Sequence, residues 1–136
     1  MGGVTLASRV FAASHLTGTF VLRSGRTAGR YFDKYRFESD PSLLAAIVEE
    51  LAPLVPPGTD GLAGLELGGV PIATLLSAHT GLPTFFVRKQ AKKYGTEKIC
   101  EGGDIAGIKL TSDVGRALPA SGIRGGQCPP YSGSIR

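Results

Sequence analysis

Residues 64–107 decide the fold: GLELGGVPIATLLSAHTGLPTFFVRKQAKKYGTEKICEGGDIAG. A short apolar run over 63–66 predicts a strand, and the glycine pair that follows lets the backbone come close to another group. The spacing of the next apolar residues predicts a helix that opens at Pro71 and stops at Gly81. A β-rich run over 84–87 then predicts a second, buried strand. Strand, glycine turn, helix and strand in this order are typical of an α/β unit.

Directly after this second strand, the residues change from mostly apolar to mostly basic and polar. Five of the fifteen Lys and Arg residues fall within eleven positions, namely Arg88, Lys89, Lys92, Lys93 and Lys98. Cations beside a glycine turn suit a polyanionic small molecule, because backbone N–H groups and positive side chains both bind phosphate oxygens. Taken by itself, the pattern fits a solvated loop without a ligand about as well, and a glycine pair after a strand is more often only a tight turn.

The chain before residue 64 adds a helix, two strands and another helix. Helical spacing predicts a helix over 5–15 that stops at Thr17-Gly18, and strands are expected over 20–23 and over 30–37, paired with each other. Asp40-Pro41 opens a helix whose apolar stripe runs to Leu54. A last strand is expected over 108–111. This alternation predicts an α/β fold with a parallel sheet covered by helices on both faces.

Composition limits the protein to a few classes. A length of 136 residues suits one domain, and the net charge of +4 suits an anionic ligand, without the long basic tail that would indicate nucleic acid. Cys100 and Cys128 match no metal or redox spacing, which favours reduced thiols in the cytoplasm. The first residues lack the order of a signal peptide, and no apolar run is long enough for a membrane span. We therefore expect a cytoplasmic protein that uses neither nucleic acid nor membrane as a partner.

Four runs of the sequence resemble the orotate phosphoribosyltransferase family. LGGVPIA, 67–73, resembles the glycine turn and helix start of that family, and FVRKQAK, 86–92, resembles the opening of its mobile catalytic loop. Tyr94-Gly95 and EGG at 101–103 are similar to the rest of this loop, although many members have a histidine in place of the tyrosine. FVLRSGRTAGRYFDKYRFESDP, 20–41, resembles the amino-terminal hairpin.

The resemblance implies both a fold and an activity. The fold is that of a type I phosphoribosyltransferase, an incomplete parallel sheet with flanking helices and an amino-terminal hairpin. The activity is that of a glycosyltransferase of pyrimidine biosynthesis, which transfers phosphoribosyl from phosphoribosyl pyrophosphate to orotate with Mg²⁺ and yields orotidine 5′-monophosphate and pyrophosphate. It also implies a homodimer, because the lysine of the family's loop reaches the pyrophosphate in the partner subunit's site.

The resemblance also assigns site residues, by position in the matched runs. Lys92 would be the catalytic lysine. Phosphoribosyl pyrophosphate would be bound by Arg88, Lys89, Lys92, Lys93, Gly68 and Gly69. Orotate, a flat anion, would meet a cation and aromatic faces, namely Arg23, Tyr31 and Phe32. No residue is assigned as a metal ligand. Tyr31 and Phe32 taken singly are also typical of core strand residues.

The carboxyl end departs from the family. Two adjacent acids and a Thr/Gly-rich turn should follow Gly107 within a few residues, and the chain reads IKLTSDV over 108–114 instead, with a single acid. We expect an incomplete phosphoribosyltransferase-like domain over 1–114 and a loose Gly/Pro/Ser/Arg-rich tail over 115–136. Such a change of character suggests a truncated or frame-shifted reading of a longer gene, with impaired activity in this chain.

Other functions remain open at this point. A non-catalytic module that binds a nucleotide or pyrophosphate on the same fold would explain the missing acids. A purine-type phosphoribosyltransferase shares the fold, but the RKxxK loop and the SGR hairpin argue against it. A small basic nucleic-acid binder has no motif in its favour.

Overall fold

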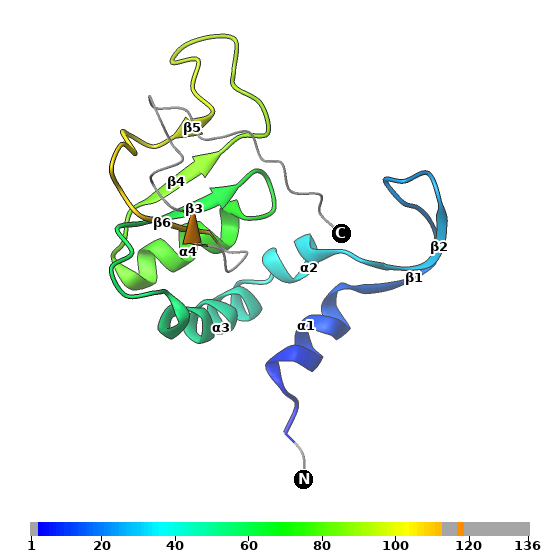
Figure 1. Ribbon diagram of the computed structural model, residues 1–136. Coiled ribbons are helices and arrows are strands. Elements are labelled where there is room, and N and C mark those ends of the chain that lie inside the picture. The colour runs from blue at the N-terminus through cyan, green and yellow to red at the C-terminus, as the bar shows by residue number, and fades with distance from the viewer. Residues whose placement is uncertain (1–2, 113–116, 119–136) are drawn as a thin grey trace. The chain divides into compact units, whose positions relative to one another are not determined.

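The computed structural model describes residues 3–112 and 117–118, and the chain divides into two compact units, Met1–Ile47 and Val48–Arg136 (Figure 1). The first unit contains α1 (Leu6–Ser14), β1 (His15–Val21), β2 (Thr27–Phe32), α2 (Lys34–Glu38) and most of α3 (Pro41–Leu51). The second contains the end of α3, the 3-10 helix η1 (Ala52–Leu54), β3 (Gly61–Leu65), α4 (Val70–Thr80), β4 (Thr84–Val87), β5 (Cys100–Glu101), β6 (Leu110–Ser112) and β7 (Ala117–Leu118).

The first unit begins with a helix that passes directly into a hairpin. The Thr5 side chain caps α1 by accepting a hydrogen bond from the Ser8 N–H at 3.2 Å. The predicted stop at Thr17-Gly18 is wrong, because both residues belong to β1, which starts immediately after the helix. β1 and β2 pair antiparallel, and the register of the pairing shifts between Thr17 and Phe20.

The expected strand over 30–37 is also partly wrong. β2 ends at Phe32, and the next residues form the short helix α2. The cause is Asp33, whose carboxylate accepts a hydrogen bond from the Tyr35 N–H at 3.1 Å and caps the first turn of α2. The predicted start of α3 is confirmed, since the Asp40 carboxylate accepts hydrogen bonds from the Ser42 and Leu43 N–H groups at 2.9 and 3.0 Å.

The second unit is built on a five-stranded sheet in the order β5-β4-β3-β6-β7. β3 lies at its centre and pairs parallel with β4 and with β6, as the α/β pattern predicts. The edge strands β5 and β7 run antiparallel to their neighbours, so the sheet is mixed. The described part of the predicted tail is limited to β7; residues 113–116 and 119–136 lie outside the described residues.

The two faces of the sheet are covered by different parts of the unit. Leu62 and Ala63 are neighbours on β3 and therefore face opposite ways. Leu62 packs with Val48 and Leu76, from α3 and α4. Ala63 packs instead with the side chains of Phe85, Cys100, Ile105 and Leu110. Helices thus cover one face, and the segment after β5 contributes to covering the other.

Within the described part of the chain, every helix is too short or too polar to cross a bilayer.

Candidate active site

A glycine turn and a basic loop leave the sheet at the same edge. Leu65, the last residue of β3, is the register partner of Val87, the last residue of β4, and the Glu66 N–H donates to the Val87 carbonyl at 2.8 Å. The chain therefore enters the glycine turn, residues 66–69, beside the point where it enters the basic loop, residues 88–99. Ligands of α/β proteins bind at the carboxyl ends of parallel strands. This edge is the candidate site.

The glycine turn packs tightly against β3. A Cβ on Gly64 would lie 3.0 Å from the Ala73 Cβ, 3.1 Å from the Gly69 carbonyl oxygen and 3.2 Å from the Val70 Cα. Glycine at this position therefore lets the start of α4 lie directly on the strand. The Glu66–Leu67 peptide bond is cis. Gly69 is the N-cap of α4 and provides no side-chain cap. Its own N–H donates to the Leu65 carbonyl at 2.8 Å, and the Val70 N–H donates to the Leu67 carbonyl at 3.1 Å, so the turn is held by its own backbone hydrogen bonds.

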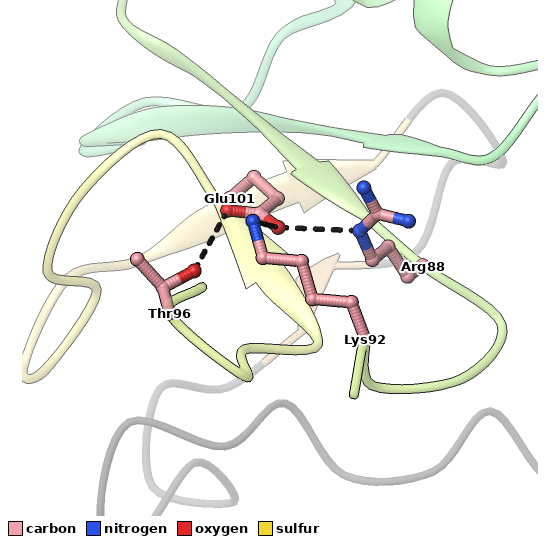
Figure 2. Close-up of polar contacts among 4 residues, drawn as sticks. All are labelled: Arg88, Lys92, Thr96 and Glu101. Carbon is pink, nitrogen blue, oxygen red and sulfur yellow. Dashed lines mark hydrogen bonds and ion pairs between the residues drawn. The ribbon is translucent and has the colours of Figure 1, made fainter. Parts of the chain in front are cut away.

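The basic loop is organised around one carboxylate, that of Glu101 (Figure 2). Glu101 Oε1 accepts from Lys92 Nζ at 2.8 Å and from Arg88 Nε at 3.2 Å, and Glu101 Oε2 accepts from Thr96 Oγ1 at 3.5 Å. Glu101 reaches the loop because β5 pairs with β4, with Glu101 opposite Phe86. The structure therefore brings together two of the predicted phosphate-binding cations, Arg88 and Lys92, on a single acid.

These cations hold the pKa of Glu101 below its ordinary value. The hydrogen bond from Lys92 is the main cause, removal of the carboxyl from water acts in the opposite direction, and the hydrogen bond from Arg88 lowers the pKa further. Glu101 is therefore ionised at neutral pH and pairs with both side chains as a carboxylate.

The loop projects from the sheet between β4 and β5 (Figure 1), and its two ends are held together at the sheet. The Arg88 N–H donates to the Ile99 carbonyl at 2.8 Å, which closes the two ends of the loop. The Lys92 side chain is only 17% exposed, and its Nζ lies 5.7 Å from the centre of the Tyr94 ring, within cation–π range. Lys89 and Lys93 are exposed and form no ion pair within the described residues. With Lys98, which is likewise exposed and in none of the ion pairs of the described residues, they are the cations of the loop left open to an incoming anion.

The predicted orotate residues all belong to the hairpin of the first unit. Arg23 lies in the exposed turn between β1 and β2, whereas Tyr31 pairs with Leu16 toward the other end of the strands. The Tyr31 ring stacks on the Phe20 ring, with ring centres 5.5 Å apart. The Phe32 and Phe37 rings are tilted toward each other, with ring centres 6.2 Å apart. The hairpin does not bring Arg23 next to either aromatic residue, and their shared role with orotate stays a prediction.

Sequence reasoning missed the role of Glu101. It placed this residue in a run similar to the family's loop but gave it no contact. The available signal was an acid at the far end of a basic run, since 88–101 contains five basic residues and only two acids, Glu97 and Glu101. The two-residue strand that delivers Glu101 to Arg88 is too short to produce a sequence pattern.

The described residues contain no set of three or more His, Cys, Asp or Glu side chains placed to hold a metal ion. Asp113, the single acid in the run 108–114 that differs from the family, lies outside the described residues.

Comparison with known proteins agrees with this geometry. No family model matches the sequence. The orotate phosphoribosyltransferase of a Nocardioides species is 52% identical over 130 residues, which cover 87% of this chain and 73% of that protein. The enzyme of the same name from Methanocella arvoryzae is 47% identical over 85 residues, 62% of this chain and 49% of that protein. The chain thus spans about half the length of the second relative.

Solved structures show the same similarity. The orotate phosphoribosyltransferase of Mycobacterium tuberculosis superposes with a TM-score of 0.64 at 32% identity, over 77% of this chain and 62% of that one. The chain thus has the fold of a type I phosphoribosyltransferase, an enzyme of the glycosyltransferase class. More narrowly, the chain belongs to the orotate phosphoribosyltransferase family.

Proposed function

We propose that this protein transfers the phosphoribosyl group of phosphoribosyl pyrophosphate to orotate, giving orotidine 5′-monophosphate and pyrophosphate. The observation that carries the proposal is the shared edge of β3 and β4, where residues 66–69 and 88–99 leave the sheet side by side. A glycine turn that a ligand can approach closely and a cationic loop at one edge match the needs of a diphosphate. Family membership supports orotate as the acceptor.

The chemistry explains why cations are needed at this place. In the reaction the bond between the ribose anomeric carbon and a diphosphate oxygen breaks, and a ring nitrogen of orotate forms the new bond to that carbon. Negative charge grows on the departing diphosphate, and fixed positive groups in a water-poor site stabilise it. In this proposal Arg88, Lys89, Lys92 and Lys93 supply the charge, and Gly68 and Gly69, which lack side chains, let the backbone of the turn come close to the diphosphate.

Lys92 is assigned the catalytic role by its position in the run that resembles the family's loop, and a lysine suits that role because it is a compact charge on a flexible stem. Arg23, Tyr31 and Phe32 are assigned to orotate. Magnesium enters this scheme with the substrate, since Mg²⁺ is usually held by phosphate oxygens, waters and one or two carboxylates. The described residues hold no ready-made ligand set, and no step is assigned to the ion.

We also propose that the protein works as a cytoplasmic homodimer and that its activity is impaired relative to its relatives. The impairment is supported by the sequence after Gly107, where Asp113 is the only acid and no adjacent pair is present to bind the ribose hydroxyls. Loss of such charge-assisted hydrogen bonds costs roughly 1.5–3 kcal/mol each.

The proposal is tested by following orotate consumption in the presence of phosphoribosyl pyrophosphate and Mg²⁺, with the Nocardioides relative assayed beside the full chain. Lys92→Met should lower kcat/KM by about 100-fold or more, the usual effect of removing a group that stabilises developing charge. Lys98→Met is the matched control, since it removes an exposed charge of the same loop that has no assigned role, and it should leave activity nearly unchanged.

Equal effects of Lys92→Met and Lys98→Met would contradict the role of Lys92. Binding of phosphoribosyl pyrophosphate without any turnover would contradict the enzyme assignment and favour a binding module.

A further inference from the structure

We propose that Glu101 is a positioning residue which occupies the place of the diphosphate in the ligand-free protein: it holds Arg88 and Lys92 until the diphosphate takes both cations over. This inference rests on the proposed function, because it names what keeps that site ordered when it is empty. It assigns to Glu101 a role in the affinity for the diphosphate.

The geometry of the cluster supports a stand-in for phosphate. Both cations donate to the same oxygen, Glu101 Oε1, at 2.8 Å from Lys92 Nζ and 3.2 Å from Arg88 Nε (Figure 2). A single oxygen shared by a lysine and an arginine is an arrangement that a phosphate oxygen also accepts. The carboxylate thus holds the two side chains close enough together to receive one anion.

Lys92 cannot stay as it is when a diphosphate binds. Its side chain is 17% exposed and that of Glu101 is 25% exposed, so the pair is largely enclosed. A diphosphate within hydrogen-bond distance of Lys92 Nζ would lie beside the Glu101 carboxylate, and like charges at this separation repel. Binding therefore requires that the lysine leave Glu101 or that the carboxylate move away.

The contacts of the loop confine this change to its middle. Thr96 Oγ1 reaches the second oxygen of Glu101 at 3.5 Å, and Tyr94 lies under the lysine. The ends of the loop are held independently by the hydrogen bond between Arg88 and Ile99. Release of Lys92 from Glu101 thus frees residues 89–98 without opening the pairing of β4 with β5.

Calorimetric titration of the full chain with sodium pyrophosphate in magnesium-free buffer tests the inference. Glu101→Gln keeps the shape of the side chain and removes the competing charge, so the Kd for pyrophosphate should fall about threefold to tenfold, in keeping with a partly exposed ion pair. Glu97→Gln makes the same change in the same loop, at an exposed residue without an ion pair in the described residues, and should change the Kd by less than about twofold. An unchanged or weaker affinity of Glu101→Gln would overturn the inference.

A double-mutant cycle separates this role from a merely structural one. In a Lys92→Met background the gain from Glu101→Gln should shrink, because the main partner of the carboxylate is gone. A gain of the same size in both backgrounds would overturn the inference. Hydrogen exchange in the free protein adds a readout without ligand: Glu101→Gln should speed exchange of amides within 89–98, and unchanged exchange would count against the proposal.

The results also distinguish this inference from the proposed function. If the wild type binds pyrophosphate and Glu101→Gln leaves the Kd unchanged, only the proposed role of Glu101 is overturned. Absence of pyrophosphate binding by both proteins overturns the diphosphate site itself, and the inference with it.

Discussion

At the scale of single residues, the candidate site depends on one shared charge. Glu101 pairs with two cations of a loop that carries three more basic residues. Without it, Arg88 and Lys92 would repel each other at the mouth of the loop. With it, both side chains are held in a defined arrangement near the glycine turn.

The pH dependence of stability should show this pairing. Because the pKa of Glu101 is lowered in the folded protein, mainly by Lys92, its contribution to stability is fully present above the ordinary carboxyl pKa and is lost as pH falls through the lowered value. We expect wild type to be more stable than Glu101→Gln by a constant margin above about pH 5, and the margin to shrink below about pH 4. Urea unfolding of both proteins across pH 3–7 measures this.

Glu97→Gln serves as the control in the same series. The difference in stability between the wild type and Glu97→Gln should stay small at every pH. A margin for Glu101→Gln that grows as the solution is acidified would contradict the assignment.

Residue patterns predicted the members of the site better than their contacts. Arg88 and Lys92 were assigned by their places in a run that resembles the family's loop, and their roles stay a prediction. Their common partner was not assigned, because contact between residues 88 and 101 depends on strand pairing rather than on any local pattern.

At the scale of elements, the position of the glycine turn depends on the close contact between α4 and β3. Substitution Gly64→Ala would place a methyl group 3.0 Å from Ala73 Cβ and 3.1 Å from the Gly69 carbonyl oxygen, which forces the helix start away from the strand. We expect a loss of about 1–3 kcal/mol in the free energy of unfolding, the usual cost of overpacking. Chemical denaturation measures the loss.

Gly29→Ala is the matched control for Gly64→Ala. An added Cβ at this position of β2 meets only the Gly18 carbonyl oxygen, at 3.9 Å, and its effect should lie within about 0.5 kcal/mol of zero. Equal losses in the two variants would show that the close helix–strand contact is not what Gly64 serves.

Elements with a long periodic pattern were predicted well, and short ones were not. α3 and α4 follow from apolar residues at helix spacing, with Gly81 in the left-handed conformation (φ 77°) ending α4 as expected. β4 is an exception among the short elements, because its run of β-formers was enough to predict it. The segment KYRFE alternates like a strand, yet the cap from Asp33 makes it a helix. A single side-chain hydrogen bond decided the conformation of five residues there.

At the scale of the whole molecule, the first unit carries exposed apolar side chains that suit a subunit interface. Phe11 is 55% exposed on α1, and Val21 is 76% exposed at the end of β1. Tyr31 and Phe32 are also close to half exposed. Most of the large apolar side chains that are exposed in the described residues belong to this unit, and exposed apolar surface on a small protein commonly marks a site that binds another chain. These side chains support the proposed homodimer.

Sedimentation of the full chain should give twice the mass of one subunit. Phe11→Ser should shift the sample toward monomer, because it removes an apolar group from the proposed interface. Leu54→Ser removes a 72% exposed leucine from the second unit and should leave the dimer intact. A monomeric wild type would contradict the proposed dimer. Equal dissociation of the Phe11→Ser and Leu54→Ser variants would contradict the placement of the interface on the first unit.

The sequence predicted the α/β class and the edge where the site lies, because both follow from local patterns repeated along the chain. It did not predict the antiparallel edge strands. β5 and β7 each have only two residues, and their pairing is set by the strands beside them rather than by their own residues.

The hydrogen bond that joins Arg88 to Ile99 has a practical consequence for protein engineering. Because both ends of the basic loop are fastened to the sheet at one point, residues 89–98 form an exchangeable cassette. A counterpart from another member of the family can be transplanted between the same two anchors, which makes this chain a scaffold for comparing catalytic loops on a constant framework.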